Sequence, residues 1–169
     1  MDSDNKKVYM HSFDLARENG EVDLCRDSWR RNKACSEEIK EAIYASNFEE
    51  SRYDLTSALN NVISEYGAER VNMVLANTVQ YKDYDGRFSQ VNRAWAESVP
   101  LPDLSSDYRS SSVCETHPAI LDGFINGARR EQEKQRKPSI MKKLNDTVPQ
   151  ASPRPENQAS QKRDAGKEL

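Results

Sequence analysis

Two carboxylates close together in the middle of the chain could hold a divalent cation. Asp83 and Asp85 stand two residues apart and are followed by Gly86. A calcium loop of the EF-hand type that began at Asp83 would need an oxygen ligand at its fifth position and glutamate at its twelfth. The chain has Arg87 and Ala94 there. We therefore predict a tight turn with Gly86 at positive φ in place of a calcium site.

A magnesium-dependent nuclease is the catalytic alternative for the same carboxylates. Two-metal hydrolysis needs several carboxylates that converge from different elements. Glu65 and Glu69 on the preceding helices could join Asp83 and Asp85, although their spacing does not show that they meet. We keep metal-dependent cleavage of nucleic acid as an alternative to the main hypothesis.

Histidines and cysteines are too few and too scattered for an obvious active site. The histidines are His11 and His117, and the cysteines Cys25, Cys35 and Cys114 show no zinc-ligand spacing. Cys114 and His117 could form an activated thiolate pair, but no third group that would orient the histidine is evident. We predict buried free thiols, and we expect no metal, no cofactor, no catalytic residue and no enzyme activity.

Helices must position these side chains, because apolar residues recur at spacings of three and four along most of the chain. Ser12, Asp54 and Ser89 stand where helix N-caps are expected, and Gly20 and Gly67 stand where helices end. The predicted helices cover residues 12–19, 21–46, 54–66, 68–80 and 89 to the prolines at 100 and 102. A last helix is capped by Thr116 or His117, and its buried side reaches Ala128 before the chain becomes solvated. The second predicted helix could split in two at residues 30–33, which are polar all round.

The fold class that follows is mainly α, a compact multi-helix domain of about five to six helices with a disordered C-terminal tail. We place the helical domain at residues 8–137 and a basic, largely disordered tail at 138–169, where Pro, Gln, Ser, Lys and Arg dominate. The bulkiest candidates for the core are Trp29, Tyr66, Phe88, Trp95 and Phe124.

Charge is divided unevenly between the two parts of the chain. Residues 1–128 hold 14 Lys and Arg against 22 Asp and Glu, a net of −8, and residues 129–169 hold 11 against 6, a net of +5. An acidic body disfavours general DNA binding, which needs cationic faces, but could meet a cationic protein groove. The basic tail could contact nucleic acid. The polar start and the absence of an apolar run near 18 residues predict a cytoplasmic protein without a membrane span.

Three segments together resemble a known family, a domain of unknown function common on integrative and conjugative elements and related mobile DNA of gut Firmicutes. They read DLARENGEVDLCRDSWRRNKAC, YGAERVNMVLANTVQYKDYDGRFSQVNRAWAESVPLP and VCETHPAILDGFI, and the resemblance covers about residues 8–128. The most specific motif is ANTVQ-x-KD-x-DGRFS. The resemblance implies a mobile-element setting, in which small proteins often protect incoming DNA, for example as anti-CRISPR inhibitors of the type II RNA-guided nuclease.

The motif also supplies the residues that we expect to contact a partner. A dense polar and aromatic surface is predicted at Tyr81, Lys82, Asp83, Tyr84, Asp85 and Arg87, with a second, basic spot at Arg30 and Arg31 that could equally be a solvated helix face. We expect a protein or ribonucleoprotein partner, with the type II CRISPR nuclease as the candidate. The alternatives are a scaffold or accessory module of conjugative transfer and the metal-dependent nuclease.

Overall fold

The computed structural model describes residues 6–48, 54–81, 87–103, 111–113 and 117–146. These residues form six helices and no strand, which confirms the predicted fold class. The helices are α1 Phe13–Asn19, α2 Val22–Phe48, α3 Leu55–Tyr66, α4 Ala68–Tyr81, α5 Gln90–Ser98 and α6 Pro118–Asp146.

The predicted caps define the helix ends. The side chains of Ser12, Asp54 and Ser89 accept hydrogen bonds from backbone N–H groups in the first turns of α1, α3 and α5. Gly20 and Gly67 both have positive φ, at 72° and 85°, which favours glycine over residues with a Cβ atom. The cap residues therefore act at the positions that the sequence predicts.

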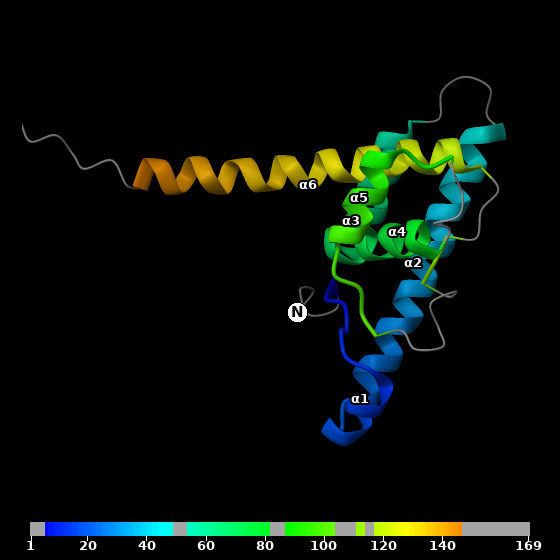
Figure 1. Cartoon of the computed structure of the whole chain (residues 1–169), viewed down its shortest axis with the longest axis vertical. Helices are drawn as coiled ribbons and strands as arrows, with labels where there is room; N and C mark the ends of the chain where they lie inside the picture. The colour runs from blue at the N-terminus through cyan, green and yellow to red at the C-terminus, as the bar shows by residue number, and fades with distance from the viewer. Residues whose placement is uncertain (1–5, 49–53, 82–86, 104–110, 114–116, 147–169) are drawn as a thin grey trace, which may run out of the picture.

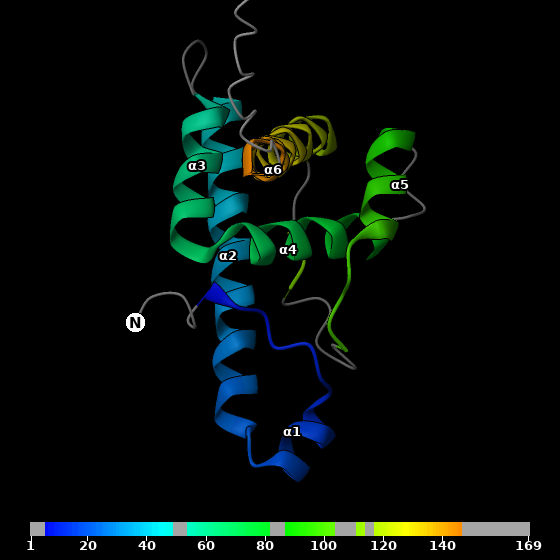
Figure 2. The same ribbon diagram turned by 90° about the vertical axis from the view of Figure 1, so that its left-hand side faces the viewer.

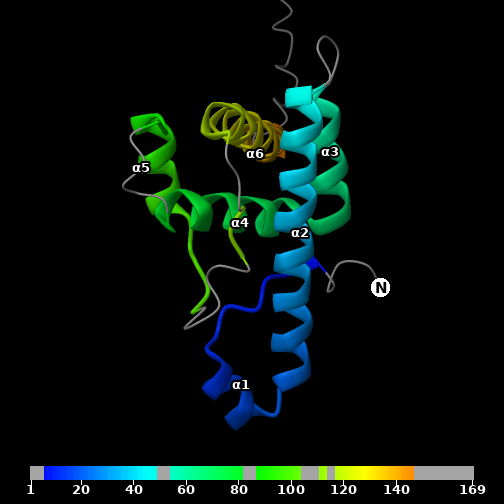
Figure 3. The same ribbon diagram turned by 90° about the vertical axis from the view of Figure 1, so that its right-hand side faces the viewer.

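Helix α4 is the centre of the fold. It contacts α2, α3, α5 and α6, and every residue from Arg70 to Val79 is buried. In Figures 2 and 3, α2 and α3 lie side by side while α4 runs across from them to α5. A helix that is surrounded on all sides has no solvent face, so its polar residues are buried together with its valines and leucines.

Helix α6 packs on the body with its first half and then projects away from it (Figure 1). Leu121, Phe124 and Ile125 join the core, whereas side chains from Glu133 to Arg136 are exposed. The helix continues past Pro138 to Asp146, so no break in secondary structure marks the domain boundary that we placed at residue 137. Pro138 lacks a backbone N–H and so removes one hydrogen bond of the helix, yet α6 continues through it.

Several sequence predictions need correction. Helix α2 does not split at residues 30–33, because Asn32 is buried there against α4 and is not part of a solvated face. The spacing of apolar residues predicts that Leu24 and Val91 lie on the buried faces of their helices, but they are 63% and 60% exposed. Among the predicted core aromatics, Phe88 and Phe124 are buried, and the remaining three are only partly buried, namely Trp29, Tyr66 and Trp95. No helix in the described part of the chain is long and apolar enough to cross a membrane.

Candidate functional site

The predicted contact motif begins at the outer end of α4. Tyr81 is the last residue of α4 and is 38% exposed, and Arg87 is exposed just before α5. Lys82, Asp83, Tyr84 and Asp85 lie outside the described residues, as does Gly86. The structure therefore places the two ends of the motif on the surface, while its centre remains a prediction.

The basic spot is not next to the motif. Arg30 and Arg31 lie on α2, beside the point where Arg70 at the start of α4 bonds to α2. Tyr81 follows Arg70 by 11 residues, which is about 16 Å along the helix axis. The predicted contact residues therefore belong to two separate surfaces. Arg30 donates to Asp27 at 3.1 Å within α2.

A polar network fixes the C-terminal side of the motif. Ser89 donates through its backbone N–H and its hydroxyl to Asp122 Oδ1 on α6, at 3.2 and 3.3 Å. The amide of Asn92, which is fully buried, donates to Asp122 Oδ1 at 2.7 Å and to Asn126 Oδ1 at 3.0 Å. Arg129 Nη1 donates to Asn92 Oδ1 at 3.0 Å. These bonds hold the start of α5 rigidly against α6.

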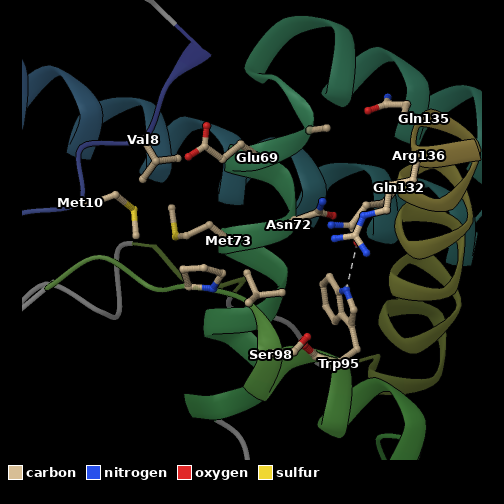
Figure 4. A pocket seen from close by; sticks show the side chains of 13 residues that line it. Val8, Met10, Glu69, Asn72, Met73, Trp95, Ser98, Gln132, Gln135 and Arg136 are labelled. Carbon is tan, nitrogen blue, oxygen red and sulfur yellow. Dashed lines mark hydrogen bonds between the residues drawn. The ribbon is translucent and has the colours of Figure 1, made fainter. Parts of the chain in front are cut away.

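A cleft of about 470 Å³ opens on another face, between the N-terminal segment, α4, α5 and α6 (Figure 4). This volume is within the range of small-ligand and anchor-residue sites. The apolar part of its lining comes from three separate stretches of chain: Val8, Met10, Met73, Trp95, Val99 and Pro100. Trp95 donates through Nε1 to Gln132 Oε1 at 3.4 Å, which joins α5 to α6 at the edge of the cleft.

Asn72 is the unusual polar residue of this cleft. Its side chain is only 7% exposed, and its amide makes no hydrogen bond within the described part of the chain. Figure 4 shows Asn72 pointing from α4 toward the side chains of α6. Glu69 and Arg136 also line the cleft, and both are exposed. Because Asn72 is not among the residues whose buried polar side-chain atoms lack a partner in the described chain, its amide reaches solvent in the cleft, where a bound molecule could take the place of water.

Arg70 forms a second buried polar cluster, on the other side of the N-terminal segment. It is 1% exposed and donates through Nη1 to Ser28 O at 2.8 Å and to Asn32 Oδ1, and through Nη2 to Lys7 O at 2.6 Å. Burial lowers the pKa of the guanidinium, because desolvation disfavours its charged form. Arg70 Nε and Asn32 Nδ2 lack partners among the described residues. Arg70 and Arg31 line a further cavity of about 550 Å³.

Titratable side chains meet at the cavity that Arg31 and Arg70 line, since Tyr9, His11, Glu21 and Asp27 also line it and Tyr9 donates its hydroxyl hydrogen to Glu21 Oε2 at 2.8 Å. No three His, Cys, Asp or Glu side chains in the part of the chain that the structure describes could hold a metal ion. The backbone carbonyl of His117 accepts from Ile120 and Leu121, as expected of a residue that starts a helix. Cys25 and Cys35 are buried free thiols, as predicted, and burial raises the pKa of Cys35 to about 12. Cys114, Asp83 and Asp85 lie outside the described residues.

Comparison with protein families matches residues 8–133, which include α1 to α5 and the first half of α6. The matching model is described as a protein of unknown function, DUF3849. The chain belongs to the DUF3849 family. Membership confirms the resemblance to a domain of unknown function, and the mobile-element setting stays a prediction. No curated protein and no solved structure matches the chain.

Sequence reasoning missed the roles of two polar residues of α4 in this DUF3849 domain, namely Arg70 in its hydrogen-bonded cluster and Asn72 in the cleft. Their signal was present in the run from Arg70 to Val79, where polar residues interrupt an apolar helix without forming a polar face. Such a pattern indicates a buried helix whose polar residues make specific hydrogen bonds or line a binding site. The cleft itself has no sequence signal, because its walls come from segments far apart in the chain.

Proposed function

We propose that this DUF3849 protein is a non-catalytic interaction protein that binds a host defence nucleoprotein and inhibits it, with the type II CRISPR nuclease as the first candidate. The observation that carries the binding part of the proposal is the cleft between the N-terminal segment, α4, α5 and α6. It combines an apolar lining with the amide of Asn72, which faces solvent in the cleft and makes no hydrogen bond to another described residue. These are the features of a pocket that receives an anchor residue from a partner protein.

The surroundings of the cleft also suit a protein partner. Gln135 and Arg136 at its edge lie on the half of α6 that projects from the body (Figure 1). A partner seated in the cleft could therefore also lie along this helix. A larger contact area around one buried anchor is typical of stable protein interfaces.

Charge and family resemblance support the choice of a defence nucleoprotein. The net charge of −8 over residues 1–128 complements the strongly cationic channel in which an RNA-guided nuclease holds its nucleic acids. The resemblance to proteins of mobile DNA implies a setting in which such inhibition is useful. The tail, with its net positive charge, could contact the nucleic acid of the complex.

The test uses the full chain and a purified type II nuclease loaded with guide RNA. We expect the nuclease to retain the protein in a pull-down and to lose DNA cleavage as the protein is added in excess. Full cleavage and no retention would rule this partner out. The conjugative scaffold alternative predicts instead a partner encoded by the same mobile element and no effect on cleavage.

The nuclease alternative is tested in the same reactions without the CRISPR enzyme. Magnesium-dependent cleavage of nucleic acid by the protein alone, abolished by Asp85→Ala, would replace our proposal with that alternative. We expect no product with or without magnesium.

A further inference from the structure

We infer that the cleft binds an extended peptide segment of the partner, with one large apolar side chain as anchor, a basic residue on one side of it and an acidic residue on the other. This inference rests on the proposed function, since it names the chemistry by which that partner would be recognised. It follows from three properties of the cleft: its apolar lining, the amide of Asn72, and the charges at Glu69 and Arg136.

The lining selects an apolar anchor. Met10 and Met73 line one side of the cleft, and Trp95 lines the other (Figure 4). Methionine side chains are flexible and polarizable, so they adapt to leucine, methionine or aromatic guests. Burying one such side chain removes apolar surface from water on both the guest and the cleft, which is the main favourable contribution to binding.

The amide of Asn72 matches a peptide group. It offers one carbonyl acceptor and an NH₂ donor, and a peptide group offers one N–H donor and one carbonyl acceptor. Because the amide makes no hydrogen bond inside the described chain, binding would satisfy it without breaking an internal bond. An extended backbone that passes over an anchor pocket presents such groups at regular intervals.

The opposite charges on the two sides of the cleft determine the direction in which the peptide segment would bind. In Figure 4, Glu69 lies on the side of the cleft near Val8, and Arg136 lies on the opposite side, on α6. Neither side chain makes a hydrogen bond or ion pair with another described side chain. A basic residue of the guest would therefore pair with Glu69 and an acidic residue with Arg136.

A nucleotide is the competing occupant. An asparagine amide can also read adenine, and a tryptophan can stack on a base. Among the described lining residues, however, Arg136 is the sole cation, and the carboxylate of Glu69 would repel a phosphate. The balance of charge therefore favours a peptide.

The experiment pans the full chain against a phage library of random nine-residue peptides. We expect enrichment of sequences with one large apolar residue between a basic and an acidic residue. The best sequence, made as a fluorescent synthetic peptide, should bind about ten-fold more weakly to Asn72→Leu, because one or two hydrogen bonds are lost. Since that amide has no internal partner, the melting temperature of Asn72→Leu should not fall.

A matched pair of charge reversals tests the direction. Arg136→Glu should shift the enriched acidic residue to a basic one, whereas Lys134→Glu, on the same exposed turn of α6 but outside the cleft, should leave the preference unchanged. The inference is wrong if no peptides are enriched, if Asn72→Leu and Arg136→Glu bind like wild type, or if ATP binds in place of peptides and loses affinity in Asn72→Leu.

The two proposals fail in different ways. If a nuclease is captured and inhibited equally by wild type and by both cleft variants, the peptide site is refuted and the proposed function stands. If the peptides bind as expected but no defence nuclease is captured, the peptide site stands and the choice of partner is refuted.

Discussion

Replacing Arg70 by methionine should cost the fold about 3 kcal/mol, although the substitution removes a buried charge. Arg70 donates to two backbone carbonyls, Ser28 O and Lys7 O, and to the side chain of Asn32. Hydrogen bonds from a charged donor contribute about 1.5–3 kcal/mol each, and part of that sum is offset by desolvation of the guanidinium. The variant would remove the charged donor from all three acceptors, of which Asn32 is fully buried.

The measurement is chemical unfolding followed by circular dichroism, together with a thermal melt. For a folded domain of this size, a loss of about 3 kcal/mol corresponds to a fall of roughly 10 °C in melting temperature. Arg70→Lys should lose about 2 kcal/mol, because one ammonium group cannot reach acceptors on both α2 and the N-terminal segment. Arg30→Met is the matched control on the protein surface and should change stability by less than about 0.5 kcal/mol.

The outcome that refutes this reasoning is a methionine variant as stable as wild type or more stable. Burial lowers the pKa of Arg70, so the charged form is disfavoured at this position. If that cost outweighed the three hydrogen bonds, methionine would be the better residue, as found when buried ion pairs are replaced by apolar side chains of similar volume.

Three further predictions concern packing, pH and the tail. Gly127→Ala should lose about 1–3 kcal/mol, because its Cβ would lie 2.9 Å from Leu59 Cδ2 where α6 crosses α3, whereas Gly123→Ala, with open space on the same helix, should be neutral or gain stability in the same thermal melts. The thiol of Cys35 has a pKa of about 12 in the fold against 9.0 for a free thiol, so the unfolded chain loses its proton first. The contribution of Cys35 to the unfolding free energy should be flat below about pH 9 and fall by about 1 kcal/mol between pH 9 and 10. Cys35→Ala should reduce this slope, and the part that remains comes from groups such as Cys25, whose pKa burial also raises. Deletion of residues 138–169 should leave the melting temperature within a few degrees, because α6 is already exposed from Glu133 to Arg136, and a larger loss would show that the removed segment docks on the body.

Local sequence signals were sufficient for the helices. Ser12, Asp54 and Ser89 cap helices because a side-chain oxygen two or three residues from an unpaired N–H depends only on neighbouring residues. Because these signals depend only on neighbouring residues, they cannot show which side chains other helices cover, and this explains the wrong predictions of burial. Leu24 fits an apolar helical stripe, but it is 63% exposed, because the contact between α1 and α2 does not cover its side chain.

The sequence alone did not predict contacts between segments that lie far apart in the chain. Residues 30–33 look like a solvated break in a helix, yet Asn32 is buried because Arg70, 38 residues further along, packs against it. Likewise, Val91 was placed on the buried face of α5, whereas that face holds Asn92, which bonds to Asp122 and Asn126 on α6. Polar partners that lie far apart in the chain can replace apolar burial, and periodicity does not detect them.

By itself, the sequence determined which stretches are helical, where they begin, where all but the last of them end, and how charge divides between body and tail, because caps, periodicity and composition act over a few residues. The tertiary structure decided which faces are buried, since α4 became the helix that four others surround. It also decided where a partner could bind. Met10, Asn72, Trp95 and Arg136 share one cleft only because chain folding brings four separate segments together.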